Sequence, residues 1–143
     1  MIERFVDYFQ PEHEISLENI EYNRSIPTIQ KQAHQMTCTD KLSVKLDLEN
    51  NGIGLLLTRS MAFEPQDLFE LSVSFSALLT IKEDRKNEID WEKINLAEEF
   101  RNNGNFILDG LFNRITLLIG QITASYGQTP IMLYPQFAPT SEK

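Results

Sequence analysis

The chain has 143 residues, a formal net charge of −8 at pH 7 and one cysteine, Cys38. Its length predicts a single domain over residues 1–143, and its acidity argues against a nucleic-acid partner, because phosphate contacts need clustered Lys and Arg. One cysteine allows no intrachain disulfide, which fits a reducing compartment, so a cytoplasmic location is expected.

The first predicted element is an N-terminal arm, residues 1–12. Apolar residues recur at helical spacing from Ile2 to Phe9, and Pro11 then interrupts them. A short amphipathic helix and an extended arm docked on the body both fit this pattern. The arm lacks the basic region and the small-residue cleavage site of a signal peptide. No stretch approaches eighteen uninterrupted apolar residues, so membrane insertion is not expected either.

Four later segments are predicted to be strands because apolar and polar residues alternate along them. They are Ile15–Asn23, Leu42–Glu49, Ile53–Phe63 and Asp67–Lys82. In the first, the apolar phase changes near Glu18–Asn19, which predicts a β-bulge. Residues 25–40 contain Pro27 and a polar run and are predicted to be a loop.

A hairpin is predicted between the second and third strands, where Asn50-Asn51-Gly52 provides the Asn-Gly pair typical of tight turns. Arg59 then breaks the apolar row of the third strand. In the fourth strand every second residue from Phe69 to Ile81 is apolar, and Ser or Thr fills most of the positions between them. This strand is expected to bury one face and to leave the other either solvated or covered by a partner.

Two helices are predicted after the strands, a short one at Trp91–Phe100 and a long one at Asn105–Tyr126. A glycine and Pro130 end the long helix. The chain beyond it contains three prolines and is predicted to be extended, with a disordered tail at residues 138–143.

The long helix is predicted to be buried on two sides, with its main apolar stripe against the sheet. The opposite face carries a row of mostly small residues at spacings of three and four: Asp109, Asn113, Thr116, Gly120 and Thr123. A chain of this size has little left to cover that side. We therefore expect the row to be an oligomer interface with a second copy of the chain, most simply across a two-fold axis.

Signals for catalysis or metal binding are weak. His13 and His34 have no metal-ligand spacing with each other or with Cys38. A His34–Cys38 nucleophile pair would be expected to have a flanking motif, and none accompanies it. The glycines of the hairpin do not stand between a strand and a helix, as those of a phosphate loop do. Adjacent carboxylates such as Glu98–Glu99 are typical of a solvated face. No catalytic residue, metal or cofactor is therefore predicted.

Apolar side chains at the ends of the long helix and in the proline-rich segment after it are more informative. Met, Tyr and Phe on such backbone are typical of a promiscuous apolar groove. The candidate client-binding residues are Phe106, Tyr126, Met132, Tyr134 and Phe137. The alternative is that they complete the core, which apolar periodicity more often indicates.

The order of these elements resembles SecB, the protein-export chaperone family. Val44-Lys45-Leu46-Asp47-Leu48 is similar to the family's second strand, and Leu68–Phe75 is similar to the strand before the helices. The best match runs from Asn102-Asn103-Gly104 through Leu111–Ile115 to Tyr126–Pro130, where SecB has a long helix that ends in a glycine and a proline. The agreement covers most of the chain, whereas residue identity is low.

The resemblance implies an α+β fold, in which one long helix and a short preceding helix pack on a four-stranded antiparallel sheet. It also implies a homotetramer and a shallow apolar groove that binds unfolded chains without a cofactor or ATP. We therefore expect a holdase chaperone for unfolded or preprotein polypeptides. The alternatives are an interaction protein dedicated to one folded partner, for example in a toxin–antitoxin system, and a small ligand-binding or enzymatic domain.

The sequence departs from SecB in two places. SecB carries acidic residues near the end of its first strand that help to dock the SecA motor, whereas Asn23 and Arg24 stand here. Glu18 and Glu21 are the candidates to replace them. SecB also has a second C-terminal helix, which this chain is expected to lack because little sequence follows Phe137.

Overall fold

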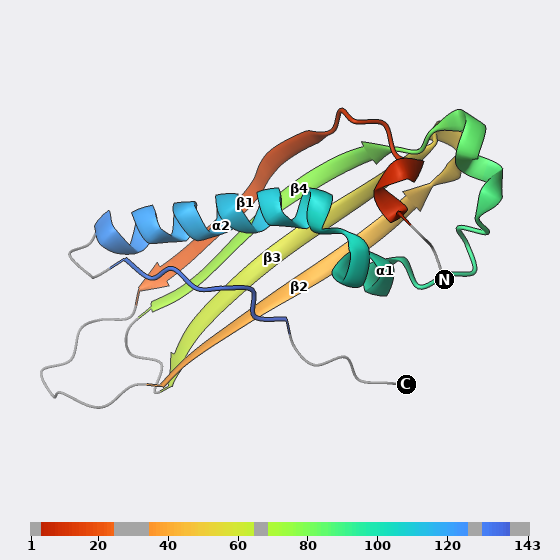
Figure 1. Cartoon of the computed structure of the whole chain (residues 1–143). Helices are drawn as coiled ribbons and strands as arrows, with labels where there is room; N and C mark the ends of the chain where they lie inside the picture. Colours follow the sequence, from red (N-terminus) through yellow and green to blue (C-terminus); the bar gives the residue numbers. More distant parts are fainter. Residues whose placement is uncertain (1–3, 25–34, 65–68, 126–129, 138–143) are drawn as a thin grey trace, which may run out of the picture.

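The computed structural model describes residues 4–24, 35–64, 69–125 and 130–137. Four strands form one antiparallel sheet in the order β1-β4-β3-β2. Their bounds are β1 Glu14–Arg24, β2 Gln35–Asp47, β3 Gly52–Glu64 and β4 Phe69–Thr80. The short helix α1, Leu96–Asn103, leads into the long helix α2, Asn105–Ser125, which lies across one face of the sheet (Figure 1). The predicted α+β architecture is confirmed.

The bulge predicted in the first strand is present in β1. The register with β4 shifts between Leu17 and Asn19. As a result Leu17 lies opposite Phe75, and Ile20 lies opposite Val73, although the two β1 residues have opposite parity. The extra residue therefore keeps the apolar side chains of β1 on the face of the sheet that α2 covers.

β2 begins at Gln35, so the predicted loop over residues 25–40 is wrong for residues 35–40. Residues 25–34 lie outside the described part of the chain. The inward-facing positions of β2 continue past Leu42 to Asp40 and Cys38, which lie opposite the buried residues Arg59 and Met61 of β3. The alternation was hidden because a charged residue, Asp40, occupies one of these inward positions.

The hairpin between β2 and β3 is confirmed. A short 3₁₀ turn, Leu48–Asn50, precedes Asn51, which has a φ of 55° in the left-handed region. Asn tolerates this conformation better than most residues, and Gly52 then starts β3. The turn thereby sets the register of the longest strand pair in the sheet.

The short helix begins later than predicted, at Leu96 rather than Trp91. Asn95 caps it, because its side-chain Oδ1 accepts a hydrogen bond from the Glu98 N–H at 3.1 Å. Trp91 lies in the preceding turn, where its side chain is buried and its indole N–H donates to the Lys86 carbonyl at 2.8 Å. A 3₁₀ segment, Glu83–Glu88, connects β4 to this turn.

The junction between α1 and α2 requires a glycine. A Cβ placed on Gly104 would lie 2.4 Å from the carbonyl oxygen of Phe100, which is a backbone atom and cannot rotate away. We expect Gly104→Ala to lower the free energy of unfolding by about 1–3 kcal/mol, measured by urea denaturation. Gly54→Ala is the matched control, because a Cβ there meets its nearest atom at 4.0 Å. Equal stabilities of the two variants would contradict this account of the junction.

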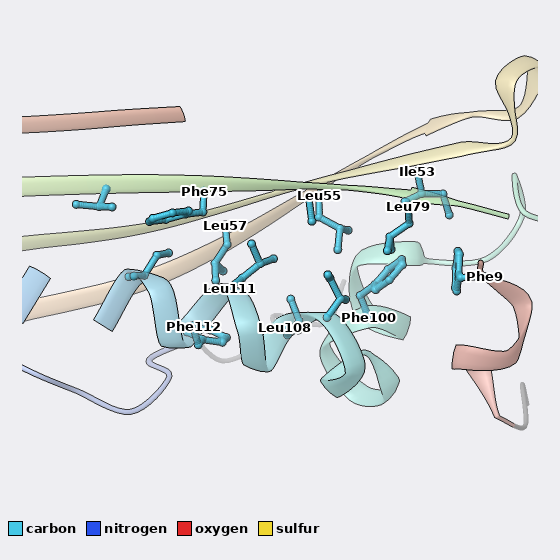
Figure 2. Close-up of a cluster of buried hydrophobic side chains, with 14 of the residues drawn as sticks. Phe9, Ile53, Leu55, Leu57, Phe75, Leu79, Phe100, Leu108, Leu111 and Phe112 are labelled. Atoms are coloured by element: carbon cyan, nitrogen blue, oxygen red, sulfur yellow. The ribbon is translucent and has the colours of Figure 1, made fainter. Parts of the chain in front are cut away.

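The core lies between α2 and the two central strands. Figure 2 shows these inward-pointing side chains: Leu55 and Leu57 of β3, Phe75 and Leu79 of β4, and Leu108, Leu111 and Phe112 of α2. Each such buried side chain contributes roughly 1.5–3 kcal/mol before conformational entropy is subtracted. This packing fixes the position of α2 on the sheet.

The N-terminal arm docks at one end of this core. It contains a 3₁₀ turn, Phe5–Tyr8, and the rings of Phe5 and Phe9 pack edge to face at 5.2 Å. Phe5 also lies 4.9 Å from Phe100 of α1. A β-bridge between Phe9 and Ile81 joins the arm to the end of β4. The sequence left open a short helix or an extended arm. The described part of the arm has a short helical turn followed by Phe9, which is extended and docked on the sheet.

By length and composition alone, α2 could cross a membrane. One of its faces is packed against the sheet, with Leu111 and Ile115 fully buried. A buried core helix meets the same length and composition criteria. The contacts of α2 in this structure are those of a core helix.

Candidate functional site

An open groove runs between α2 and the extended C-terminal segment, which we define as residues 130–137. Figure 1 shows this segment (blue) running back along α2 toward α1. The groove has a volume of about 610 Å³. Its lining residues are Phe112, Asn113, Thr116 and Leu117 on α2, and Met132, Leu133, Tyr134 and Pro135 on the segment.

Three large apolar side chains around the groove are exposed. Leu117 is 58% exposed, Met132 is 53% exposed and Tyr134 is 87% exposed. They come from both walls, because Leu117 lies on α2 and the other two lie on the segment. Exposed apolar residues that gather around a groove mark an interaction surface more strongly than isolated ones do.

Small residues of α2 hold the segment from the helix side. The Ile131 N–H donates to Thr123 Oγ1 at 2.9 Å. Gly120 leaves room for Met132, whose Cγ would lie 3.1 Å from a Cβ at that position. The small side chains therefore allow the segment to approach α2 closely.

A buried ion pair holds the segment from the sheet side. Arg59 on β3 donates from Nε and Nη2 to the two carboxylate oxygens of Asp40 on β2, at 2.8 and 2.9 Å. The same guanidinium donates from Nη1 to the Leu133 carbonyl and from Nη2 to the Tyr134 carbonyl, both at 3.1 Å. Arg59 is 1% exposed and Asp40 is 2% exposed.

Asp40 also binds the segment directly. Its Oδ2 accepts a hydrogen bond from the Gln136 N–H, and its own N–H donates to the Gln136 carbonyl at 3.0 Å. A parallel β-bridge between Asp40 and Phe137 continues this contact. The segment is therefore attached to the edge of β2 as well as to α2.

The two charges stabilise each other in this buried position. Burial alone lowers the pKa of Arg59, but the hydrogen bonds and the charge of Asp40 more than offset burial, so the pKa lies above its ordinary value. Arg59 is therefore fully charged at physiological pH. Its guanidinium also lies 5.9 Å from the ring centre of Phe112, within the range of a cation–π contact.

Cys38 lies two residues from Asp40 on the same face of β2 and is partly buried. Burial raises the pKa of its thiol; the charge of Arg59 lowers it and that of Asp40 raises it, and the net shift is upward. Because the thiolate is the reactive form, we expect iodoacetamide at pH 8 to alkylate Cys38 severalfold more slowly in the folded protein than in urea. Mass spectrometry of timed samples measures both rates, and equal rates would contradict the expectation.

The structure separates the predicted client-binding residues. Met132 and Tyr134 line the groove. Phe137 lies at the end of the segment, where its ring packs 5.4 Å from Phe112 and beneath the Arg101 guanidinium at 4.4 Å. Phe106 belongs instead to the aromatic cluster of the N-terminal arm, 5.7 Å from Phe9. Tyr126 lies outside the described residues.

The predicted interface row on α2 is divided in the same way. Gly120 and Thr123 are buried and Thr116 is partly buried, and all three contact the C-terminal segment of their own chain. The premise that the chain has little left to cover this side of α2 is therefore wrong for these three residues. Asp109 and Asn113 remain exposed. Participation of the row in an oligomer interface stays a prediction.

The candidate docking carboxylates lie on β1, and both are exposed. Glu18 accepts a hydrogen bond from Ser76 Oγ at 2.6 Å. Glu21 lines a hollow of about 420 Å³ together with residues that include Ser60 and Ser72. This hollow is separate from the groove.

The described residues contain no group of three or more His, Cys, Asp or Glu side chains placed to hold a metal ion. His13 is exposed, and His34 lies outside these residues, so the His34–Cys38 pair cannot be placed.

Sequence reasoning missed Asp40 and Arg59 as parts of the site. Their signal was the hairpin register, which sets them opposite each other across the Asn51-Gly52 turn.

No protein-family model matches the chain, and no curated protein sequence matches it. Among solved structures, the fold is similar to that of the Mycobacterium tuberculosis Rv1957 SecB-like chaperone, in complex with a ChAD peptide from the Rv1956 HigA1 antitoxin. The TM-score is 0.68 at 16% sequence identity, over 92% of this chain and 93% of that chain. At this low sequence identity, the similarity supports a shared fold and nothing further. The chain therefore has the SecB-like fold, a four-stranded antiparallel sheet with a long helix across one face.

Proposed function

We propose that this chain is an ATP-independent holdase chaperone that binds extended, unfolded polypeptide in the groove between α2 and the C-terminal segment. The observation that carries the proposal is the open groove with exposed Leu117 and Tyr134 on opposite walls. An open groove accepts a chain that enters at one end and leaves at the other. A site for a small molecule is usually concave enough to cover most of its ligand.

Binding in such a groove depends on apolar burial and needs no catalytic group. Met132 and Tyr134 offer a flexible thioether and an amphipathic ring, which adapt to different client side chains. The affinity for any one client is expected to be modest, because a flexible chain loses conformational entropy when it binds. This proposal involves no cofactor and places the protein in the cytoplasm.

A second copy of the chain is part of the proposal. Leu17 and Ile20 of β1 are 49% and 43% exposed, and the bulge turns both toward the same face of the sheet as α2. β1 is also an edge strand, whose unpaired backbone groups are open to pairing. These features favour a homo-oligomer, dimer or tetramer, that contacts through β1 and the exposed side of α2. Docking of a SecA-type motor at Glu18 and Glu21 remains a weaker part of the same proposal.

The second candidate is an interaction protein dedicated to one folded partner. One structure with a similar fold, the Rv1957 SecB-like chaperone, is in complex with a peptide from an antitoxin. A dedicated protein would bind one sequence tightly and would ignore unrelated unfolded chains. A small ligand-binding or enzymatic domain is the third and weakest alternative.

An aggregation assay distinguishes the first two candidates. Several unrelated proteins are diluted from denaturant without ATP, with this chain at a near-stoichiometric ratio, and light scattering is recorded. Suppression of aggregation across the panel is the result expected of a holdase. If a folded and soluble chain leaves every client to aggregate, the holdase proposal is wrong and the dedicated-partner candidate takes its place.

A further inference from the structure

The Asp40–Arg59 pair is placed behind the groove rather than in it. Both side chains are almost fully buried, and neither lines the groove. A client in the groove would therefore not touch the charges directly. It would touch Met132 and Tyr134, which belong to the backbone segment that the pair holds.

A buried ion pair often stabilises a sheet less effectively than apolar side chains do. Taking two charges out of water costs several kcal/mol per ion, and apolar residues of similar volume often serve stability as well or better. The additional hydrogen bonds of this pair indicate another role. Arg59 reaches the carbonyls of Leu133 and Tyr134, and Asp40 holds both backbone groups of Gln136.

These contacts fix backbone atoms next to the side chains exposed at the groove. Binding the carbonyls of Leu133 and Tyr134 sets the path of the backbone, and thereby the direction in which the Tyr134 ring projects. Tyr134 is 87% exposed, so side-chain packing does little to hold its ring in place. Only the planar guanidinium fork can hold a carboxylate and two carbonyls together in this way.

We propose that Asp40 and Arg59 are positioning residues that hold the C-terminal segment as a fixed wall of the groove, and so raise its affinity for unfolded polypeptide. The inference rests on the proposed function, because it assigns to the pair a role in that same groove. A wall that is already ordered loses less conformational entropy when a client binds. A pair that only stabilised the sheet would leave client affinity unchanged in any variant that still folds.

Two variants loosen the segment without leaving a buried charge unpaired. Arg59→Lys keeps a positive charge beside Asp40, but a single ammonium group cannot replace the fork that reaches both carbonyls. Gln136→Pro removes the N–H that donates to Asp40 while leaving β2 and β3 intact. It therefore tests the positioning role even if Arg59→Lys does not fold. Gln136→Ala is the matched control, because it keeps that N–H and loses only the side-chain amide, which the proline variant also loses and which donates to the Tyr134 carbonyl at 2.8 Å. Ile53→Val, a buried site far from the segment, controls for a general loss of stability.

Two readouts are taken on folded protein, with folding checked by circular dichroism. The first is hydrogen exchange of the Asp40 amide, which donates to Gln136 and so reports attachment of the segment. The second is the dissociation constant for a fluorescein-labelled, reduced and carboxymethylated α-lactalbumin, which stays unfolded in buffer. We expect Arg59→Lys and Gln136→Pro to speed the exchange and to weaken binding about tenfold, because the client must then order the wall. The two controls are expected to change neither readout.

The possible failures are distinct. If the exchange speeds up but the dissociation constant is unchanged, the positioning role is wrong and the proposed function stands. If the exchange does not change in either variant, the pair does not hold the segment, and the inference also fails. If the unaltered protein does not bind the unfolded probe, the proposed function fails and the positioning role fails with it.

Discussion

Arg59→Met is expected to lower the free energy of unfolding by about 3–5 kcal/mol, because it leaves the carboxylate of Asp40 buried without its charge partner. The two side chains are 1% and 2% exposed, so water does not replace the lost contacts. The carbonyls of Leu133 and Tyr134 lose the guanidinium as a donor in the same variant and keep the side chains of Thr116 and Gln136. Urea denaturation followed by circular dichroism measures the change.

The double variant Asp40→Asn with Arg59→Met serves as the control for this prediction. It removes the buried charge together with its partner, so it is expected to recover part of the stability lost in Arg59→Met. A loss below about 1 kcal/mol in the single variant is the size expected of a solvent-exposed ion pair. Such a result would contradict the burial described for these side chains.

The double variant Leu117→Ala with Tyr134→Ala is expected to weaken binding of unfolded polypeptide by about a hundredfold, the loss that two hot-spot residues together produce. One residue comes from each wall of the groove. Because both are exposed, their removal should change the free energy of unfolding by only about 0.5 kcal/mol or less. Fluorescence anisotropy of a labelled unfolded chain measures the affinity.

Leu78→Ala is the matched control for this loss of apolar surface. Leu78 is 54% exposed on the opposite face of the sheet, away from α2. Phe137→Ala is a poorer test of the groove, since Phe137 packs on Phe112 and its loss also loosens the segment. If Leu78→Ala weakens binding as much as the double variant, the client-binding surface lies on the other face of the sheet.

Much of the fold follows from local patterns in the sequence. The strict alternation from Phe69 to Ile81 predicted β4. The Asn51-Gly52 pair predicted the hairpin that sets β2 and β3 in register. The phase change near Glu18 predicted a bulge that the structure confirms. These features are local, because each depends on the conformation of a few adjacent residues.

The features that sequence patterns missed depend on contacts between distant segments. β2 extends further toward the N-terminus than predicted, because an inward-facing charge, Asp40, finds its partner on β3. The helix row with Gly120 and Thr123 is covered by the chain's own C-terminal segment. Composition showed that this side of α2 is suited to close packing, but it could not show which segment packs there.

The residues of the candidate site could be predicted only in part, because some of its contacts join distant segments. Met132 and Tyr134, two of the predicted client-binding residues, both line the groove, since they are two residues apart in an extended segment. That clients bind them stays a prediction. Phe106 was grouped with them on residue type, whereas it packs into the aromatic cluster around Phe9. The roles of Asp40 and Arg59 required the tertiary structure, although counting outward from the hairpin turn pairs them.

Site-specific photo-crosslinking tests the central claim, that unfolded polypeptide lies in the groove between α2 and the C-terminal segment, most directly. Benzoylphenylalanine is placed at position 117 on α2 or, as a control, at position 78 on the other face of the sheet. A labelled unfolded chain is added and the sample is irradiated. We predict strong crosslinking from position 117 and little from position 78. Equal crosslinking from both positions, or crosslinking from position 78 alone, would contradict the account.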